Sequence, residues 1–322
     1  MNIDKLNSVC KQYNVKAAYY DLPVDIILKF TEKLSFYFSP YTHAIENVIN
    51  KNSKNLIEKL ESLIKTRSIS NSESLPLMKL TEVFIILSIY LTIVYLLYNN
   101  DTIKKYNLRL ISMVHNSFMI VISAYIFIAT SLQTIHDNYT LFGNPIDITP
   151  TGIPMTKIVW LFYFSKIFEF NDTIIMLLKK NYRQVSFLHV YHHTSIFIVM
   201  WLVTLFGPNG DTYFSTILNT FIHILMYSYY LGSALKLSFV SFIKKYITIA
   251  QILQFSLNFI QASFNILDYY FFRPEKHLNN GGYPHFLSCL LLLYMISMLS
   301  LFVHFYINDR KRMGNLKDKK SN

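Results

Sequence analysis

The chain has 322 residues, of which 52% are apolar and only 15% are charged. An ordinary soluble domain carries about 25% charged residues, so this composition argues against a soluble protein. The formal net charge is +11, which alone would suit a nucleic-acid partner. Most basic residues after position 79 lie in short links between apolar runs, as in membrane proteins, so nucleic acid is not an expected partner.

Residues 1–79 form an N-terminal extension rich in Lys, Asn and Ser. Val24, Leu28 and Thr31 recur at helical spacing, and a second apolar stripe begins at Ile45. We therefore expect two amphipathic helices that lie on the membrane or on the rest of the protein, followed by a flexible linker.

Seven apolar segments follow, each long enough to cross a hydrocarbon layer of about 30 Å as a helix. In chain order they cover residues 80–98, 110–133, 157–178, 185–206, 212–235, 246–271 and 284–307. The sequence therefore predicts an all-α integral membrane protein, with a domain of seven transmembrane helices over residues 80–307 and a basic tail over residues 308–322.

The sides of the membrane follow from the basic residues. They concentrate in the links 99–109, 179–184 and 236–245 and in the tail, which predicts that these segments and the C-terminus are cytosolic. Because the number of spans is odd, the N-terminus is expected on the opposite side. The chain ends in Lys319-Lys320-Ser321-Asn322, which resembles the dilysine retrieval signal of endoplasmic-reticulum membrane proteins.

Ionisable residues occur inside the third expected span, where each charge near the bilayer centre costs at least ~2.5 kcal/mol. Lys166 and Glu169 share one helical face, and Asp172 and Thr173 extend it toward the cytosol. A structural ion pair between Lys166 and Glu169 would explain two of them, whereas the continued polar face favours a functional site.

Histidines gather at the start of the fourth span. His189, His192 and His193 have i, i+3 and i+4 spacing and so share one face. Imidazole can bind a metal, act as a general base or serve as a nucleophile. The expected depths bring this face level with His223 on the fifth span and with Gln251 on the sixth. The only cysteines, Cys10 and Cys289, are far apart, so neither a disulfide framework nor a cysteine-based zinc site is expected.

Four motifs carry a resemblance to a known family. They are K-x-x-E-x-x-D-T from Lys166, H-x-x-H-H from His189, H-x-x-M-Y-x-Y-Y from His223 and T-x-x-Q-x-x-Q from Thr248. Together, and in this order, they resemble the ELO family of fatty-acid elongases, over about residues 75–306.

The resemblance implies a very-long-chain 3-oxoacyl-CoA synthase of the endoplasmic-reticulum membrane. Such an enzyme joins a long-chain acyl-CoA with malonyl-CoA and releases carbon dioxide and CoA, without a bound metal or cofactor. The family is thought to use an acyl-histidine, which by motif position falls on His192, with His189, His193 and His223 polarising carbonyls or moving protons.

Other residues of the motifs are expected to bind substrate, and the acyl tail is expected in a dry tunnel between the helices. The expected substrate-binding residues are Lys166, Glu169, Asp172, Asn219, Tyr227, Tyr230, Gln251 and Gln254. The CoA phosphates are expected near Lys179, Lys180, Arg183, Lys244 and Lys245, although these could be orientation charges alone. Expected partners are membrane lipid and the ketoacyl-CoA reductase, dehydratase and enoyl-CoA reductase of the elongation cycle, and a homodimer is left open.

Two alternatives compete with this interpretation. A membrane di-iron desaturase or hydroxylase also has an H-x-x-H-H box, but it needs more histidines than the cytosolic side of this chain supplies. A seven-helix receptor or transporter would explain charges within spans. It would not explain three histidines on one helical face.

Overall fold

The computed structural model describes residues 23–33, 62, 72, 75–238, 240–274 and 282–321. Within these ranges the regular structure is entirely helical, and no strand occurs. The second amphipathic helix expected from Ile45 lies outside the described residues, as does Cys10.

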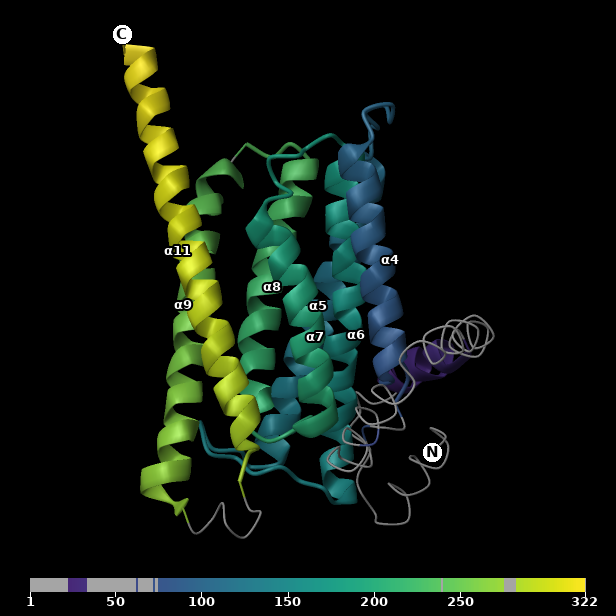
Figure 1. Ribbon diagram of the computed structural model, residues 1–322, viewed down its shortest axis with the longest axis vertical. Coiled ribbons are helices and arrows are strands. Elements are labelled where there is room, and N and C mark those ends of the chain that lie inside the picture. The colour runs from purple at the N-terminus through teal and green to yellow at the C-terminus, as the bar shows by residue number, and fades with distance from the viewer. Residues whose placement is uncertain are drawn as a thin grey trace.

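Seven long helices run alongside one another in the described part of the chain (Figure 1). They are α4 (Leu80–Asn99), α5 (Arg109–His136), α6 (Ile153–Leu178), α7 (Phe187–Phe206), α8 (Thr212–Ala234), α9 (Val240–Leu267) and α11 (His285–Ser321). Each coincides with one expected apolar segment. A short 3₁₀ turn, η1 (Pro150–Gly152), precedes α6, and the π-helical turn η2 (Asp268–Phe272) extends α9.

Four of these helices are long and apolar enough to cross a membrane by length and composition. They are α4, α5, α7 and the His285–Asp309 part of α11. The other three, α6, α8 and α9, carry ionisable or amide side chains among their apolar residues, and many of these polar groups are buried inside the protein. Polar side chains lower the average hydropathy of a helix without being exposed to lipid when they face the interior of a bundle.

Helix α6 is the centre of the bundle. Every residue from Ile153 to Lys166 is buried, and α6 contacts α4, α5, α7 and α8. Around it, α5 packs on α8, and α9 packs on α11 along the left edge of Figure 1. The polar residues of α6 are therefore held in the interior by neighbours on several sides.

The helix over residues 23–33 packs against this bundle, one of the two placements that the sequence left open. Its residues Val24, Leu28 and Thr31 are buried. Asp25 Oδ1 lies 2.9 Å from the Nζ atom of Lys157, a residue in the first turns of α6 that is only 3% exposed.

Three backbone carbonyls just before α4 are held by aromatic side chains of the bundle. The carbonyl oxygens of Pro76, Leu77 and Met78 accept hydrogen bonds from Trp160 Nε1, Tyr163 Oη and Trp201 Nε1 respectively, each at 2.9 Å. These bonds satisfy buried polar groups of α6 and α7 and fix where the chain enters α4.

The connection between α5 and α6 folds back onto the start of α8. The Asp211 carboxylate accepts hydrogen bonds from the backbone N–H of Gly143 at 2.9 Å and of Asn144 at 2.7 Å. Gly210 has φ +65°, and a Cβ there would come within 2.7 Å of a backbone oxygen, so a glycine is required. Burial raises the pKa of the Asp211 carboxyl, and it raises the pKa of Tyr139, whose Oη accepts from Gly210 N, to about 12.

Helix α11 continues through the segment that the sequence marks only as a basic tail. It runs to Ser321 and projects beyond the other helices at the top of Figure 1. Lys and Arg recur in this segment and are good helix formers, which favours continuation of the helix past the last apolar residue.

Candidate active site

A cavity of about 110 Å³ lies between α6, α7, α8 and α9, and we call it the histidine cavity. Ten of the twelve residues expected to be catalytic or to bind substrate line it, namely Glu169, Asp172, His189, His192, His193, Asn219, His223, Tyr230, Gln251 and Gln254. Residues from four helices thus meet in one place. The other two, Lys166 and Tyr227, lie behind its wall and contact residues that line it.

The Glu169 carboxylate joins α6 to His223 on α8. Glu169 Oε1 is 2.7 Å from Lys166 Nζ and 3.2 Å from His223 Nδ1. Lys166 Nζ also donates to Asn219 Oδ1 at 3.1 Å and lies 4.0 Å from the centre of the Phe162 ring. Because Lys166 and Glu169 are each only 1% exposed, this ion pair holds two buried charges together and orients the His223 ring.

The second carboxylate of α6 has a separate pair of partners. Asp172 Oδ2 accepts a 2.6 Å hydrogen bond from Tyr227 Oη, and Asp172 Oδ1 lies 2.9 Å from His115 Nε2. His115 belongs to α5 and was not among the expected site residues. The sequence places it on the same side as the four motif histidines, but no motif connects it with Asp172.

His189 and His192 are each held by a hydroxyl group. The Thr173 hydroxyl lies 2.9 Å from His189 Nε2 and 3.0 Å from Tyr90 Oη. Tyr294 of α11 places its hydroxyl 3.1 Å from His192 Nδ1. Tyr294 was also missed, since α11 carries no motif that marks it.

His193 differs from the other histidines. It is 7% exposed, its ring centre is 4.4 Å from that of His189, and its Nδ1 atom is buried without a hydrogen-bond partner in the described structure. A buried nitrogen without a partner is unfavourable, so the position calls for a ligand or a water molecule that meets it.

The ring orientations determine which nitrogens are available for chemistry. His192 and His223 each engage Nδ1, and no described residue hydrogen-bonds to the Nε2 atom of either ring. An imidazole whose second nitrogen is held in this way can act as a nucleophile or a base through the first. Within the described ranges, no group of three His, Cys, Asp or Glu residues is arranged to hold a metal ion.

A larger cavity of about 510 Å³, the outer cavity, shares His189, His192 and Gln251 with the histidine cavity. Of the five basic residues expected near CoA phosphates, Arg183 and Lys244 line it. The other three have partners elsewhere: Lys179 Nζ lies 3.3 Å from Ser112 Oγ, Lys180 Nζ lies 3.2 Å from the carbonyl oxygen of Asn100, and Lys245 stacks on Phe242 and Tyr246.

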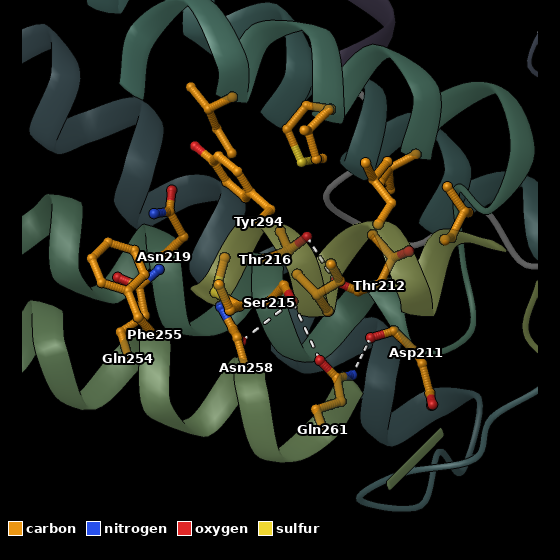
Figure 2. Close-up of a pocket in the computed structure, with 18 of the residues that line it drawn as sticks. Asp211, Thr212, Ser215, Thr216, Asn219, Gln254, Phe255, Asn258, Gln261 and Tyr294 are labelled. Atoms are coloured by element: carbon orange, nitrogen blue, oxygen red, sulfur yellow. Dashed lines mark hydrogen bonds between the residues drawn. The ribbon is translucent and has the colours of Figure 1, made fainter. Parts of the chain in front are cut away.

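A third space of about 60 Å³, the inner cavity, continues from His192, Asn219 and Gln254 on the side opposite the outer cavity. Its walls differ in character. The wall formed by α7 and α11 is mostly aliphatic, whereas the wall formed by α8 and α9 presents hydroxyl and amide groups (Figure 2). Most of the surface that faces this cavity is nevertheless apolar, and the polar groups are confined to the α8 and α9 side and to one end.

The amide groups of this second wall continue a pattern that begins in the sequence motif. Asn258, Gln261 and Asn265 follow Gln251 and Gln254 at alternating steps of three and four residues, so one stripe of α9 carries all five. The motif alone suggested only its first two members, but its spacing could have revealed the rest.

Cys289 lies away from this chemistry. Its Sγ atom is 3.7 Å from the Nε2 atom of His285, at the beginning of α11, and the residue lines none of the three cavities.

Comparison with known proteins identifies the family of this chain. Residues 75–318 match the family model described as ELO: GNS1/SUR4 family. The chain belongs to this family. The matched region begins just before α4 and includes every residue of the three cavities.

Individual relatives are named as elongases. Fatty acid elongase 6 of Leishmania major is 32% identical over 301 residues, which cover 92% of this chain and 77% of the relative. Very long chain fatty acid elongase 2 of Rattus norvegicus is 36% identical over 233 residues (69% of this chain, 78% of the relative). Very long chain fatty acid elongase 5 of Homo sapiens is 35% identical over 235 residues (72% and 75%). Together with its apolar helices, this relationship makes the chain a membrane protein and an enzyme of fatty acid elongation.

Proposed function

We propose that this ELO protein is the condensing enzyme of the elongation cycle. It joins a long-chain acyl-CoA with malonyl-CoA to give 3-oxoacyl-CoA, carbon dioxide and CoA. The observation that supports this most directly is the histidine cavity, where His192 and His223 have their Nδ1 atoms engaged by other groups. Both rings can then meet a thioester through Nε2.

In the first half-reaction, His192 Nε2 attacks the thioester carbonyl. The nitrogen–acyl bond forms, the carbon–sulfur bond breaks, and the departing CoA thiolate takes up a proton from a neighbouring imidazolium. In this proposal His223, held by the Glu169 carboxylate, moves that proton. His193 Nδ1 donates to the developing oxyanion when it carries a proton.

In the second half-reaction, malonyl-CoA loses carbon dioxide and becomes an enolate. The enolate carbon attacks the acyl-histidine carbonyl, the new carbon–carbon bond forms, and His192 leaves as a free imidazole. The amide N–H groups of Asn219 and Gln251 are candidates to stabilise the enolate oxygen, because both residues line the histidine cavity.

The same proposal assigns roles to the other two cavities. The inner cavity receives the acyl tail, and the outer cavity receives CoA, with Arg183 and Lys244 next to its phosphates. All seven long helices then span the membrane of the endoplasmic reticulum, with the C-terminus and the outer cavity on the cytosolic side. A reductase, a dehydratase and an enoyl-CoA reductase complete the cycle as partners.

The decisive experiment incubates the purified protein with a long-chain acyl-CoA alone. We expect intact-mass measurement to show the added acyl group, hydroxylamine to remove it, and His192→Ala to abolish it. His136→Ala is the matched control, because this histidine is exposed at the end of α5. Normal condensation without an acyl adduct, or two bound irons per chain, would overturn the proposal.

A further inference from the structure

The inner cavity ends in a group of polar side chains that we call the polar floor. It consists of Asp211, Thr212, Gln261, Asn265 and Tyr283, which come from the α7–α8 link, the start of α8, α9 and the segment before α11. Figure 2 shows Asp211, Thr212 and Gln261 at one end of the pocket, with Asn219 and Gln254 toward the other. The far end of a bound acyl chain would therefore meet polar groups.

Most of the polar floor is held by hydrogen bonds within the protein. Gln261 Nε2 donates to the backbone oxygen of Asp211 at 2.7 Å. Thr212 Oγ1 donates to the Gly207 carbonyl, so the 2.7 Å contact between Thr212 and Tyr283 uses the Tyr283 hydrogen. These bonds fix the floor before any chain arrives.

Asn265 is the exception. Its side chain faces the Asp211 carboxyl and lowers the pKa of that group, as an amide nitrogen directed toward a carboxylate does. The other end of the amide, Oδ1, is a buried acceptor that no described residue satisfies, on a side chain that is 7% exposed and lines the inner cavity. A buried acceptor without a donor is unfavourable, and a ligand that supplies the donor gains that energy.

The unmet requirement is for a hydrogen-bond donor. The methyl end of an ordinary chain cannot donate to Asn265 Oδ1, and neither can a carbon–carbon double bond. A hydroxyl group can donate to Asn265 Oδ1 and also accept from the second Nε2 hydrogen of Gln261, which is one helical turn away on the same face of α9.

We propose that the polar floor is a subsite for a hydroxyl group at the far end of the acyl chain, so that ω-hydroxyacyl-CoAs are preferred substrates. The inference rests on the proposed function, because it needs the acyl tail in the inner cavity. Asn265 is eleven residues beyond Gln254 on α9, so the subsite lies about 16 Å from the histidine cavity. Only a long-chain acyl group spans this distance, and the inner cavity of about 60 Å³ must widen to hold its methylene groups.

The test compares palmitoyl-CoA with ω-hydroxypalmitoyl-CoA in one preparation of the full-length protein. We expect kcat/KM for condensation to be about tenfold higher for the hydroxylated chain, a typical size for one satisfied buried hydrogen bond. Asn265→Leu should remove this preference. Asn258→Leu changes the same wall nearer the histidine cavity, and it should leave the ratio intact.

Equal use of the two substrates by the unaltered protein, or a preference for palmitoyl-CoA, overturns the inference without any variant. A ratio that persists in Asn265→Leu overturns the role of Asn265. Affinities of both acyl-CoAs, measured by calorimetry, distinguish a failure of the polar floor from a failure of the proposed condensing function. Tighter binding of the hydroxylated chain without condensation would support the polar floor and refute the proposed function.

Discussion

Replacing Glu169 by Gln tests the ion pair at the centre of the bundle. The substitution keeps the shape of the side chain but removes the charge that faces Lys166 Nζ at 2.7 Å and His223 Nδ1 at 3.2 Å. Two consequences are expected from this one change. Lys166 loses its counter-charge, and His223 loses the carboxylate that orients it.

The magnitude follows from burial. Removing one partner of a fully buried ion pair typically costs about 3–5 kcal/mol, because the remaining charge is left uncompensated. Lys166 keeps the Asn219 oxygen at 3.1 Å and the face of Phe162, so we expect a loss near the lower end, about 3 kcal/mol. Loss of an oriented general base lowers kcat by about a hundredfold or more.

The assay measures thermal stability in detergent and condensation activity on the same samples. Asp309→Asn is the control for stability, because its pair with Lys244 is exposed at 38% and 52% and should contribute under about 1 kcal/mol. The double variant Lys166→Met with Glu169→Gln separates the two effects. It leaves no unpaired charge, so it should recover most of the stability while activity stays low.

Either of two results would refute this reasoning. If Glu169→Gln is as stable as the unaltered protein, the pair does not compensate buried charge. If the double variant regains activity, Glu169 does not act through His223.

Three further predictions concern other contacts. Tyr294→Phe removes the hydroxyl beside His192 Nδ1, so kcat should fall about tenfold in steady-state assays while KM stays unchanged. A tenfold rise in KM with unchanged kcat would contradict an orienting role for Tyr294. Arg183→Gln should raise KM for both CoA substrates several-fold, whereas Lys179→Gln, which lies outside the outer cavity, should not. Equal effects of the two substitutions would show that Arg183 does not bind CoA. Burial raises the Tyr139 pKa from 10.0 to about 12, so its contribution to stability is complete below pH 10 and is lost as the pH rises through 12. The free energy of unfolding is measured at about pH 10 and about pH 12 for both proteins. Between these values the unaltered protein should lose on the order of 2–3 kcal/mol more than Tyr139→Phe does. Equal losses in the two proteins would contradict the raised pKa of Tyr139.

The helices and most of the histidine cavity were predictable because their signals are local. An apolar run of sufficient length predicts a long helix, and His189, His192 and His193 share a face through spacing alone. The membrane depths inferred from the basic links placed His223 and the glutamines level with that face, and the family resemblance then agreed with this placement. These residues do meet in one cavity.

The missing residues depend on contacts between distant segments. Tyr294 reaches His192 across 102 positions of sequence, and His115 reaches Asp172 across 57. Neither tyrosine nor histidine is unusual enough in its own helix to reveal such a partner. Tyr227 shows the reverse case: its place in a motif indicated substrate contact, whereas it lies behind the cavity wall against Asp172.

The three carbonyls before α4 bear on how this protein can be shortened. A version beginning at Leu75 would keep Pro76, Leu77 and Met78 and so every acceptor for Trp160, Tyr163 and Trp201. A version beginning at Leu80, where the first long helix starts, would strand three indole or phenol hydrogens in the interior, each at about 1–3 kcal/mol. The five residues before α4, which look like dispensable linker, thus carry acceptors that the interior of α6 and α7 requires.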